Sequence, residues 1–291
     1  MSAHHRMDKA FKDALELPLL PNTKYVIMSD CHRGVGNKND NFFKNKNLCF
    51  VALKYYYQNQ FTYIELGDGE ELWENKDLES IQNTYHDIYR LFSKFHETHR
   101  FYMLYGNHDI AKHNKNYVRK KYARLYCTDT TKNKELFQPL SCHESIILRA
   151  TSNPEKALYL THGHQVSLLN STFWPLAQFL VRYLWKPLEH FGITDPTSAA
   201  KNYYIRTDTE KKLNAWATDT KHILIAGHTH RPLLTSKSPY YCNAGSLIHP
   251  NCITCIEIEN TTLTLVKWCM RTQTNDRLYL QREIISKPVS I

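Results

Sequence analysis

The sequence has no long hydrophobic run, no internal repeat and no flexible linker, and each of these absences excludes a class of protein. No stretch of about 18 uninterrupted apolar residues occurs, so we expect no membrane-spanning helix. The first 22 residues lack the basic head and apolar core of a secretory signal. Without a repeat or a segment rich in Gly, Ser and Pro, the simplest division is a single domain, residues 1–291.

The cysteine content and the net charge indicate the redox compartment and the kind of partner. Eight cysteines in a chain without a signal segment argue against a disulfide scaffold and favour a reducing compartment, so we expect a cytoplasmic protein. The 37 Lys and Arg exceed the 28 Asp and Glu by nine charges. This excess of positive charge favours an anionic partner. The candidates are nucleic acid, the headgroups of a membrane surface and a phosphorylated small molecule.

Short apolar runs alternate with helical periodicity in the first third of the chain. The pattern predicts strands at 24–30, 62–68 and 100–105 with helices at 39–58 and 78–98 between them. Such alternation predicts parallel strands joined by crossover helices. Further strands are predicted at 145–149, 157–161, 222–226, 239–243, 252–259, 263–268 and 277–285, and helices at 172–191 and 199–218. A helical insertion therefore occupies about 165–220.

Five of the predicted strands end in clusters of Asp, Asn and His. The clusters are Asp30-Cys31-His32, Gly67-Asp68, Gly106-Asn107-His108-Asp109, His162-Gly163-His164 and Gly227-His228-Thr229-His230. Because ligands bind at the carboxyl ends of strands in open α/β sheets, we expect one assembled site. The alternative is that these are turn residues and buried core histidines, but five converging clusters favour a functional site.

The residue types in these clusters point to a metal site. Carboxylate, amide and imidazole groups suit Mn²⁺, Fe²⁺ or Zn²⁺ better than metals that prefer thiolates. Asp30 and His32 are two residues apart and face the same way, whereas Cys31 faces the sheet. The seven candidate ligands exceed what one tetrahedral ion needs, which favours two ions sharing a carboxylate. They are Asp30, His32, Asp68, Asn107, His162, His228 and His230.

In this order, the motifs D-x-H, G-D-x-x-E, G-N-H-D, H-G-H and G-H-T-H resemble those of the calcineurin-like metallophosphoesterases. They span residues 30–230, and the β-rich tail fits the family's second sheet. The resemblance implies a four-layer α/β/β/α sandwich of two mixed β-sheets flanked by helices, with a dinuclear metal site at one edge.

The resemblance also implies a role for each site residue. Asp30, His32, Asp68 and His230 would hold one divalent ion, and Asp68, Asn107, His162 and His228 the other, with Asp68 bridging. The two ions are expected to be Mn²⁺, with Fe²⁺, Zn²⁺ or Mg²⁺ as alternatives. A hydroxide between the two ions would attack phosphorus. His108 would protonate the leaving oxygen, and Glu71 would orient and polarise His108.

Two further residues are weaker substrate-binding candidates. Arg33 follows the first motif and either contacts phosphate or is an exposed loop arginine. His164 either supports the site or substrate or is a turn residue. Asn243, in an N-x-G-S turn, is interpreted as support for the last metal loop.

The second motif bears on the substrate. Ser/Thr protein phosphatases carry G-D-x-V-D-R-G there, whereas this chain has GDGEELWE with Leu72 in place of the phosphate-binding Arg, which disfavours that activity. G-D-x-x-E-x-W resembles the UDP-2,3-diacylglucosamine pyrophosphatase branch, which cleaves a lipid-linked pyrophosphate beneath a helical insertion. We therefore expect hydrolysis of a phosphodiester, pyrophosphate or phosphomonoester bond in a phosphorylated small molecule or lipid-linked substrate.

The alternatives are a nuclease, because DNA-cleaving relatives carry G-N-H-D, and a non-catalytic binding module. Two further regions each have two interpretations. The helix at 172–191 either packs on the core or forms a lid over the site. The basic stretch 110–136 is either a solvated surface or a rim that draws substrate towards His108. Cys252-x-x-Cys255 lacks a second pair and is interpreted as core packing.

Overall fold

The structure is a computed structural model that describes residues 2–122, 124–125, 134–135, 140–150, 157–185, 188, 198–235, 240–274 and 276–291. For 124–125 and 134–135 it describes the backbone, where β5 (Arg124–Leu125) pairs with β6 (Lys134–Glu135).

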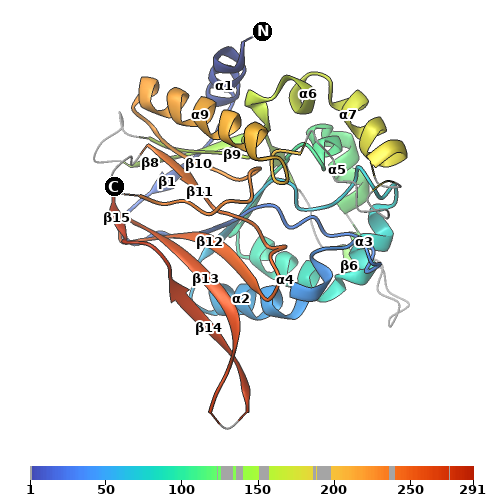
Figure 1. Cartoon of the computed structure of the whole chain (residues 1–291). Coiled ribbons are helices and arrows are strands. Elements are labelled where there is room, and N and C mark those ends of the chain that lie inside the picture. Colours follow the sequence, from blue (N-terminus) through green and yellow to red (C-terminus); the bar gives the residue numbers. More distant parts are fainter. Residues whose placement is uncertain are drawn as a thin grey trace.

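Two mixed β-sheets form the centre of the molecule (Figure 1). The smaller sheet has the order β1 (Leu15–Leu19), β8 (Ser145–Ala150), β9 (Ala157–Thr161), β10 (Ile223–Ala226) and β11 (Tyr241–Asn243). The larger sheet has the order β14 (Leu278–Ile284), β13 (Thr262–Thr272), β12 (Cys252–Glu259), β2 (Lys24–Met28), β3 (Thr62–Leu66), β4 (Phe101–Leu104) and β7 (Cys142–His143), with β15 (Val289–Ser290) paired to β13. Strands β2, β3 and β4 run parallel, as their crossover helices predict.

Apolar side chains fill three layers between the elements. In β2, Val26 and Met28 face the helices below the larger sheet, whereas Tyr25 and Ile27 face the space between the sheets. This alternation is the period of two of a strand whose two faces are both buried. On the far side, Met7 and Trp216 pack helices against the smaller sheet.

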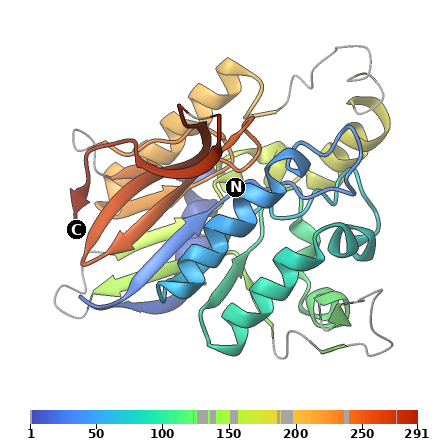
Figure 2. The same cartoon turned by 90° about the horizontal axis from the view of Figure 1, so that it is seen from below.

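The helices complete the outer layers. Helices α1 (Ala3–Lys12) and α9 (Tyr203–Thr220) cover the smaller sheet (Figure 1). Helices α2 (Lys46–Gln58) and α4 (His86–Glu97) cover the larger sheet, as the view from below shows (Figure 2). The predicted four-layer α/β/β/α sandwich is confirmed.

Several helix boundaries differ from the sequence-based predictions. The predicted helix 39–58 is a 3₁₀ turn, η1 (Phe43–Asn45), followed by α2. The predicted helix 78–98 divides into α3 (Leu78–Thr84) and α4 at Tyr85, whose hydroxyl donates to Asp40 at 2.5 Å. Helix α1 and strand β1 were not predicted.

The predicted insertion at 165–220 contains short helices and one long one. They are η3 (His164–Val166), α6 (Leu168–Ser171), α7 (Trp174–Leu180), the π-helix η4 (Val181–Trp185) and α9. Of the predicted helix 172–191, residues 186, 187 and 189–191 lie outside the described part. Pro175 occupies the first turn of α7, whose N-cap is Phe173.

Helix α7 has one buried and one exposed face. Ala177 and Val181 are buried against Trp73 of the loop after β3. Leu176 and Phe179 on the other face are each more than half exposed. Among the helices that the structure describes, none is long and apolar enough to cross a membrane.

The cysteines with described positions are all free thiols. Cys255 is buried, and its sulfur lies 3.2 Å from the Tyr56 hydroxyl, so it packs in the core as interpreted from the sequence, whereas Cys252 is only partly buried. Cys31 is likewise buried beneath the helices, facing away from its neighbours Asp30 and His32.

A network of buried charges links the loops after β2, β3 and β4. Arg33 lies 2.7 Å from both Glu65 and Glu70, and Lys112 lies 2.6 Å from Asp109 and also contacts Glu70. All five side chains are at most 2% exposed. Because isolated buried charges are costly, each charge here has an opposite partner.

This network corrects two predictions. Arg33 neither contacts the proposed substrate site nor lies exposed, because its guanidinium is held by glutamates and packs on Tyr89 and Phe92. Lys112, counted in the basic stretch 110–136, is buried in η2 (Ile110–His113) and is not a surface charge. The side chains of 123–136 in that stretch lie outside the described part, and α5 (Lys115–Tyr122) carries its remaining described basic residues.

The ionised form of Glu70 is stabilised by this network. Burial raises the pKa of Glu70, but Lys112 and Arg33 outweigh burial and hold the pKa below its ordinary value. A depressed folded-state pKa contributes stability above the unfolded-state pKa, about 4.3 for Glu, and this contribution is lost as the pH falls.

We therefore expect Glu70→Gln to lower the free energy of unfolding at pH 7 by ~3–5 kcal/mol, because the cations lose a buried partner. The difference from wild type should shrink as the pH falls below about 4.3. Urea unfolding between pH 3 and pH 7 measures this. The control is Glu97→Gln, at an exposed glutamate of α4, which should follow wild type. A pH-independent difference for Glu70→Gln would contradict the role of its charge.

Candidate metal centre

The five clusters meet where the carboxyl ends of strands from both sheets converge. Strands β2, β3 and β4 of the larger sheet precede Asp30, Asp68 and Asn107 respectively. Strands β9 and β10 of the smaller sheet precede His162 and His228. The loops are joined across the sheets, since the His228 amide donates to Asp30 Oδ2 at 2.8 Å.

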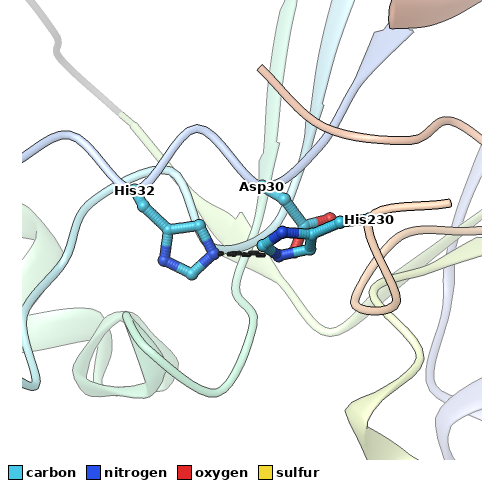
Figure 3. A group of neighbouring side chains, drawn as sticks. All are labelled: Asp30, His32 and His230. Atoms are coloured by element: carbon cyan, nitrogen blue, oxygen red, sulfur yellow. Dashed lines mark hydrogen bonds and ion pairs between the residues drawn. The ribbon is translucent and has the colours of Figure 1, made fainter. Parts of the chain in front are cut away.

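Asp30, His32 and His230 form the first group of candidate ligands (Figure 3). Asp30 Oδ1 lies 3.0 Å from His230 Nε2 and 3.7 Å from His32 Nε2. The two imidazole Nε2 atoms are 3.3 Å apart. Figure 3 shows the three side chains pointing towards one another from two different loops, an arrangement that a shared cation suits.

Asp68, His162 and His228 form the second group, and their ligand atoms all lie within 4.8 Å of one another. Asp68 Oδ2 is 3.1 Å from His162 Nε2 and 3.7 Å from His32 Nε2 of the first group. The Asp68 carboxylate therefore lies between the two groups, where a bridging ligand belongs.

Three of the predicted ligands carry buried polar atoms that make no hydrogen bond of normal geometry, namely Asp30 Oδ1, Asn107 Oδ1 and His162 Nε2. Asp30 Oδ1 and His162 Nε2 make ion-pair contacts instead, such as those with His230 and Asp68 given above. His162 Nδ1 donates to the Leu66 carbonyl at 3.1 Å, so Nε2, which lies beside Asp68, is the nitrogen that can bind a cation once it loses its proton. Metal-bound histidines typically fix their second nitrogen in this way. Because unsatisfied buried polar atoms are costly, these residues fit a divalent cation.

The ligand loops adopt strained backbone conformations. Five of the seven predicted ligands have positive φ: Asp30 (55°), His32 (49°), Asp68 (51°), His228 (66°) and His230 (56°). For a residue other than glycine this costs about 1–3 kcal/mol each, and such strain concentrates at functional sites. The turns that carry the ligands are thus held by the surrounding structure.

Two glycines allow the loops to approach the buried carboxylates. A Cβ on Gly106 would lie 2.1 Å from Asp68 Oδ1, and one on Gly227 would lie 2.4 Å from Asp30 Oδ2. Asp109 fixes the same region, because its carboxylate accepts from the amides of Gly69 at 2.9 Å and Gly106 at 2.7 Å.

The electrostatics keep both carboxylates ionised. Burial raises the pKa of Asp30 and Asp68, but the neighbouring histidines outweigh it and hold both pKa values well below the ordinary range. Burial and the adjacent His162 lower the pKa of His228 to about 3, so its imidazole is neutral. Burial opposes a charge on His162, but Asp68 and Asp30 raise its pKa to about 9. A divalent cation bound here would displace that proton.

One carboxylate holds two histidines at the edge of the centre. Glu71 Oε1 lies 2.8 Å from His108 Nδ1, the contact that the predicted role of Glu71 requires. Its Oε2 lies 2.9 Å from His32 Nδ1, a contact that sequence reasoning missed. Trp73 stacks on His108, with ring centroids 4.3 Å apart and planes at 28°.

A cavity of about 230 Å³ opens in front of His108. The predicted site residues His32, Asp68, Glu71, Asn107, His108, His228 and His230 line it. Sequence reasoning missed Asn170, whose Nδ2 lies 3.5 Å from His228 Nε2, and His249, whose Nε2 donates to the His230 carbonyl at 3.0 Å. Nothing local in the sequence distinguishes these two residues.

The weaker candidates differ in their outcome. His164 is 2% exposed and lines a second cavity with Tyr105 and His113, so the structure does not place it in the cavity of the metal centre. The ring centroids of His164 and His162 are 5.6 Å apart, so His164 lies next to a candidate ligand. Asn243 supports the last metal loop as interpreted, because its Nδ2 donates to the Gly227 carbonyl at 2.7 Å.

We expect Gly106→Ala to weaken Mn²⁺ binding by ~10-fold or more, the scale seen when groups that support ligands are changed. The added methyl group would overlap the Asp68 carboxylate. Isothermal titration calorimetry measures the affinity. Gly34→Ala is the control, because its added methyl would meet Asp40 at 3.0 Å and none of the seven ligands. Equal affinities of wild type and Gly106→Ala would contradict the assignment of Asp68 as a ligand.

Solved structures align along most of the chain. Vps29 from Cryptosporidium parvum is 14% identical with a TM-score of 0.35, covering 91% of this chain and 98% of that one. Chaetomium thermophilum Vps29 is 10% identical with a TM-score of 0.36, covering 92% and 97%. A mutant of a cold-active protein tyrosine phosphatase is 14% identical with a TM-score of 0.42, covering 92% and 82%. Comparison with curated proteins finds no match.

The sequence also matches a family model described as calcineurin-like phosphoesterase, over residues 23–232. The matched segment contains all five clusters and both groups of candidate ligands. The chain therefore belongs to the calcineurin-like phosphoesterase family.

Proposed function

We propose that the protein is a dinuclear-metal-dependent phosphoesterase in which His108 is the general acid. The observation that carries the proposal is the arrangement of His108 in one cavity with both ligand groups, its Nδ1 held by Glu71 at 2.8 Å. When bound, two divalent ions would polarise the phosphoryl group and supply the activated water that attacks it.

The ligand groups support a division of residues between the two ions. Asp30, His32 and His230 would hold one ion, and His162, His228 and Asn107 the other. Asp68 would contribute to both, since it lies within 3.7 Å of His32 and 3.1 Å of His162. The mixed oxygen and nitrogen donors suit Mn²⁺ best, with Fe²⁺, Zn²⁺ or Mg²⁺ as alternatives.

The position of His108 supports proton donation. Its side chain is 23% exposed, and it faces the cavity. Burial lowers the pKa of His108, but Glu71 and Asp68 outweigh burial, so the pKa lies above its ordinary value. With Nδ1 held by Glu71, Nε2 is left to donate its proton to the leaving oxygen.

The cavity supports a small phosphorylated substrate. Trp73 and Trp185 offer aromatic surface, and Lys201 offers a positive charge. Leu72, which stands where protein phosphatases carry a phosphate-binding Arg, is buried. We therefore propose a phosphodiester or pyrophosphate of a small molecule as the substrate, with the part of 165–220 around Val181–Trp185 closing the cavity.

One observation favours a lipid-linked substrate as the second candidate. The exposed face of α7 carries Leu176 and Phe179 next to the segment that lines the cavity. An acyl chain leaving the cavity along this face would cover exposed apolar surface. Comparing a nucleotide diphosphate sugar with its diacylated form as substrates distinguishes the two candidates.

We expect Asp68→Ala to lower kcat/KM by more than ~100-fold. Asp68 contacts both ligand groups, so its removal should lower kcat/KM more than removal of a residue that only supports a ligand. The assay uses Mn²⁺-loaded protein with nucleotide diphosphate esters, cyclic nucleotides, phosphomonoesters and DNA. The matched control is Asp219→Ala, whose carboxylate is 65% exposed. Wild-type turnover in a folded Asp68→Ala protein would contradict the dinuclear mechanism, and inactivity of the wild type on the whole panel would contradict the enzyme assignment.

A further inference from the structure

Arg182 joins the π-helix η4 to the loop that follows β3. Its Nε donates to the Trp73 carbonyl at 2.7 Å, and its Nη2 donates to the Leu72 carbonyl at 2.8 Å. A guanidinium presents its donors in a rigid plane, so two bonds to adjacent carbonyls fix the orientation of that backbone. The two residues so held come directly after Glu71.

This loop provides most of the described contacts that fix His108. Glu71 binds His108 Nδ1 at 2.8 Å, and Trp73 stacks on the ring with a centroid distance of 4.3 Å. The Leu72 amide donates to the His108 carbonyl at 3.2 Å. The edge of the imidazole, one of its faces and its own backbone are therefore all held by residues 71–73.

Helix α7 and the π-helix η4 also contact the loop of residues 71–73 through apolar side chains. Trp73 is 3% exposed and packs with Ala177 and Val181, while Trp174 and Trp185 lie around them. Trp73 thus contacts both the helix and His108. A shift of the helix is transmitted to His108 through one aromatic ring and through the two carbonyls that Arg182 holds.

We propose that Arg182 is a positioning residue for His108. It fixes the Leu72–Trp73 backbone so that Glu71 and Trp73 hold the imidazole in line with the leaving oxygen. This inference rests on the proposed phosphoesterase function. As the phosphorus–oxygen bond to the leaving group breaks and the bond to the attacking water oxygen forms, the water releases one proton to solvent and His108 gives its proton to the leaving oxygen. His108 then regains a proton from solvent.

A positioning role and a merely structural role of Arg182 predict different dependences of the rate on the leaving group. An ester of p-nitrophenol needs little protonation, because p-nitrophenolate leaves readily as an anion. Esters of more basic phenols depend on the proton from His108. Loss of positioning should therefore slow the hydrolysis of esters with basic leaving groups, whereas general damage to the fold or to metal binding should slow every ester alike.

The test measures kcat/KM for a series of aryl esters of thymidine 5′-phosphate with Mn²⁺-loaded wild type, Arg182→Ala and Arg182→Lys. We expect Arg182→Ala to lower kcat/KM by ~10–100-fold for the most basic leaving group, within the range that general acids contribute, and less than ~3-fold for p-nitrophenol. Arg182→Lys, which keeps one donor, should lie between. His108→Ala gives the largest effect that the series can show.

Tyr183→Ala is the matched control, because Tyr183 is the next residue of η4, is 56% exposed and does not line the cavity. It should follow wild type across the series. The proposal would be overturned if Arg182→Ala lowered kcat/KM by the same factor for every ester. It would also be overturned if Arg182→Ala bound Mn²⁺ with wild-type stoichiometry and kept the wild-type dependence of kcat/KM on the leaving group. If Arg182→Ala does not fold, Arg182→Lys decides by the same criteria.

A second readout does not depend on catalysis. In metal-free protein, the His108 Nδ1 proton shared with Glu71 should give a downfield imidazole resonance, assigned by its loss in His108→Ala. We expect this resonance to be lost or broadened in Arg182→Ala and kept in Tyr183→Ala. An unchanged resonance in Arg182→Ala would overturn the positioning role. If wild type hydrolyses no ester while the resonance responds as expected, the proposed function fails and the positioning contact stands.

Discussion

Two buried carboxylates at the junction of the sheets impose the constraint on which the rest of the structure depends. Asp30 and Asp68 are at most 1% exposed and remain ionised. Buried negative charge requires cations or hydrogen-bond donors around it. Histidines from the loops after β2, β9 and β10, together with backbone amides, supply part of that requirement. Asp30 Oδ1, Asn107 Oδ1 and His162 Nε2 are among the buried atoms that lack a hydrogen bond, and a divalent cation would satisfy these three.

The strained ligand turns depend on a second layer of charge beneath them. Asp109 accepts from the amides of Gly69 and Gly106 and is itself held by Lys112. Lys112 and Arg33 share Glu70, so the loops after β2, β3 and β4 are joined through buried ion pairs. Left-handed conformations at the ligands are thus compensated by contacts that the unfolded chain does not make.

On the open side of the centre, the proposed catalytic acid and a helical segment share one loop. Glu71 contacts both His108, the proposed proton donor, and the candidate ligand His32, so a single carboxylate joins the two. Trp73 lies between His108 and the helix that carries Val181, and Arg182 holds the backbone of the same loop. The segment that lines the cavity therefore also contacts the loop that holds the proposed proton donor.

Local patterns in the sequence were enough to predict the alternating strands and helices and the residues that converge on the site, because apolar runs and the polar turns that end them are short-range features. The four-layer α/β/β/α class followed from the resemblance of the motifs to a known family. Local patterns did not reveal that Arg33 is buried among glutamates, that His164 faces a second cavity or that the predicted helix 78–98 breaks at Tyr85. They also did not show that Glu71 holds two histidines or that Arg182 holds the loop after Glu71. Such features depend on partners far apart in the chain, 39 residues for Glu71 with His32 and 110 residues for Arg182 with Leu72. Only the packing of the two sheets and their helices brings such partners into contact.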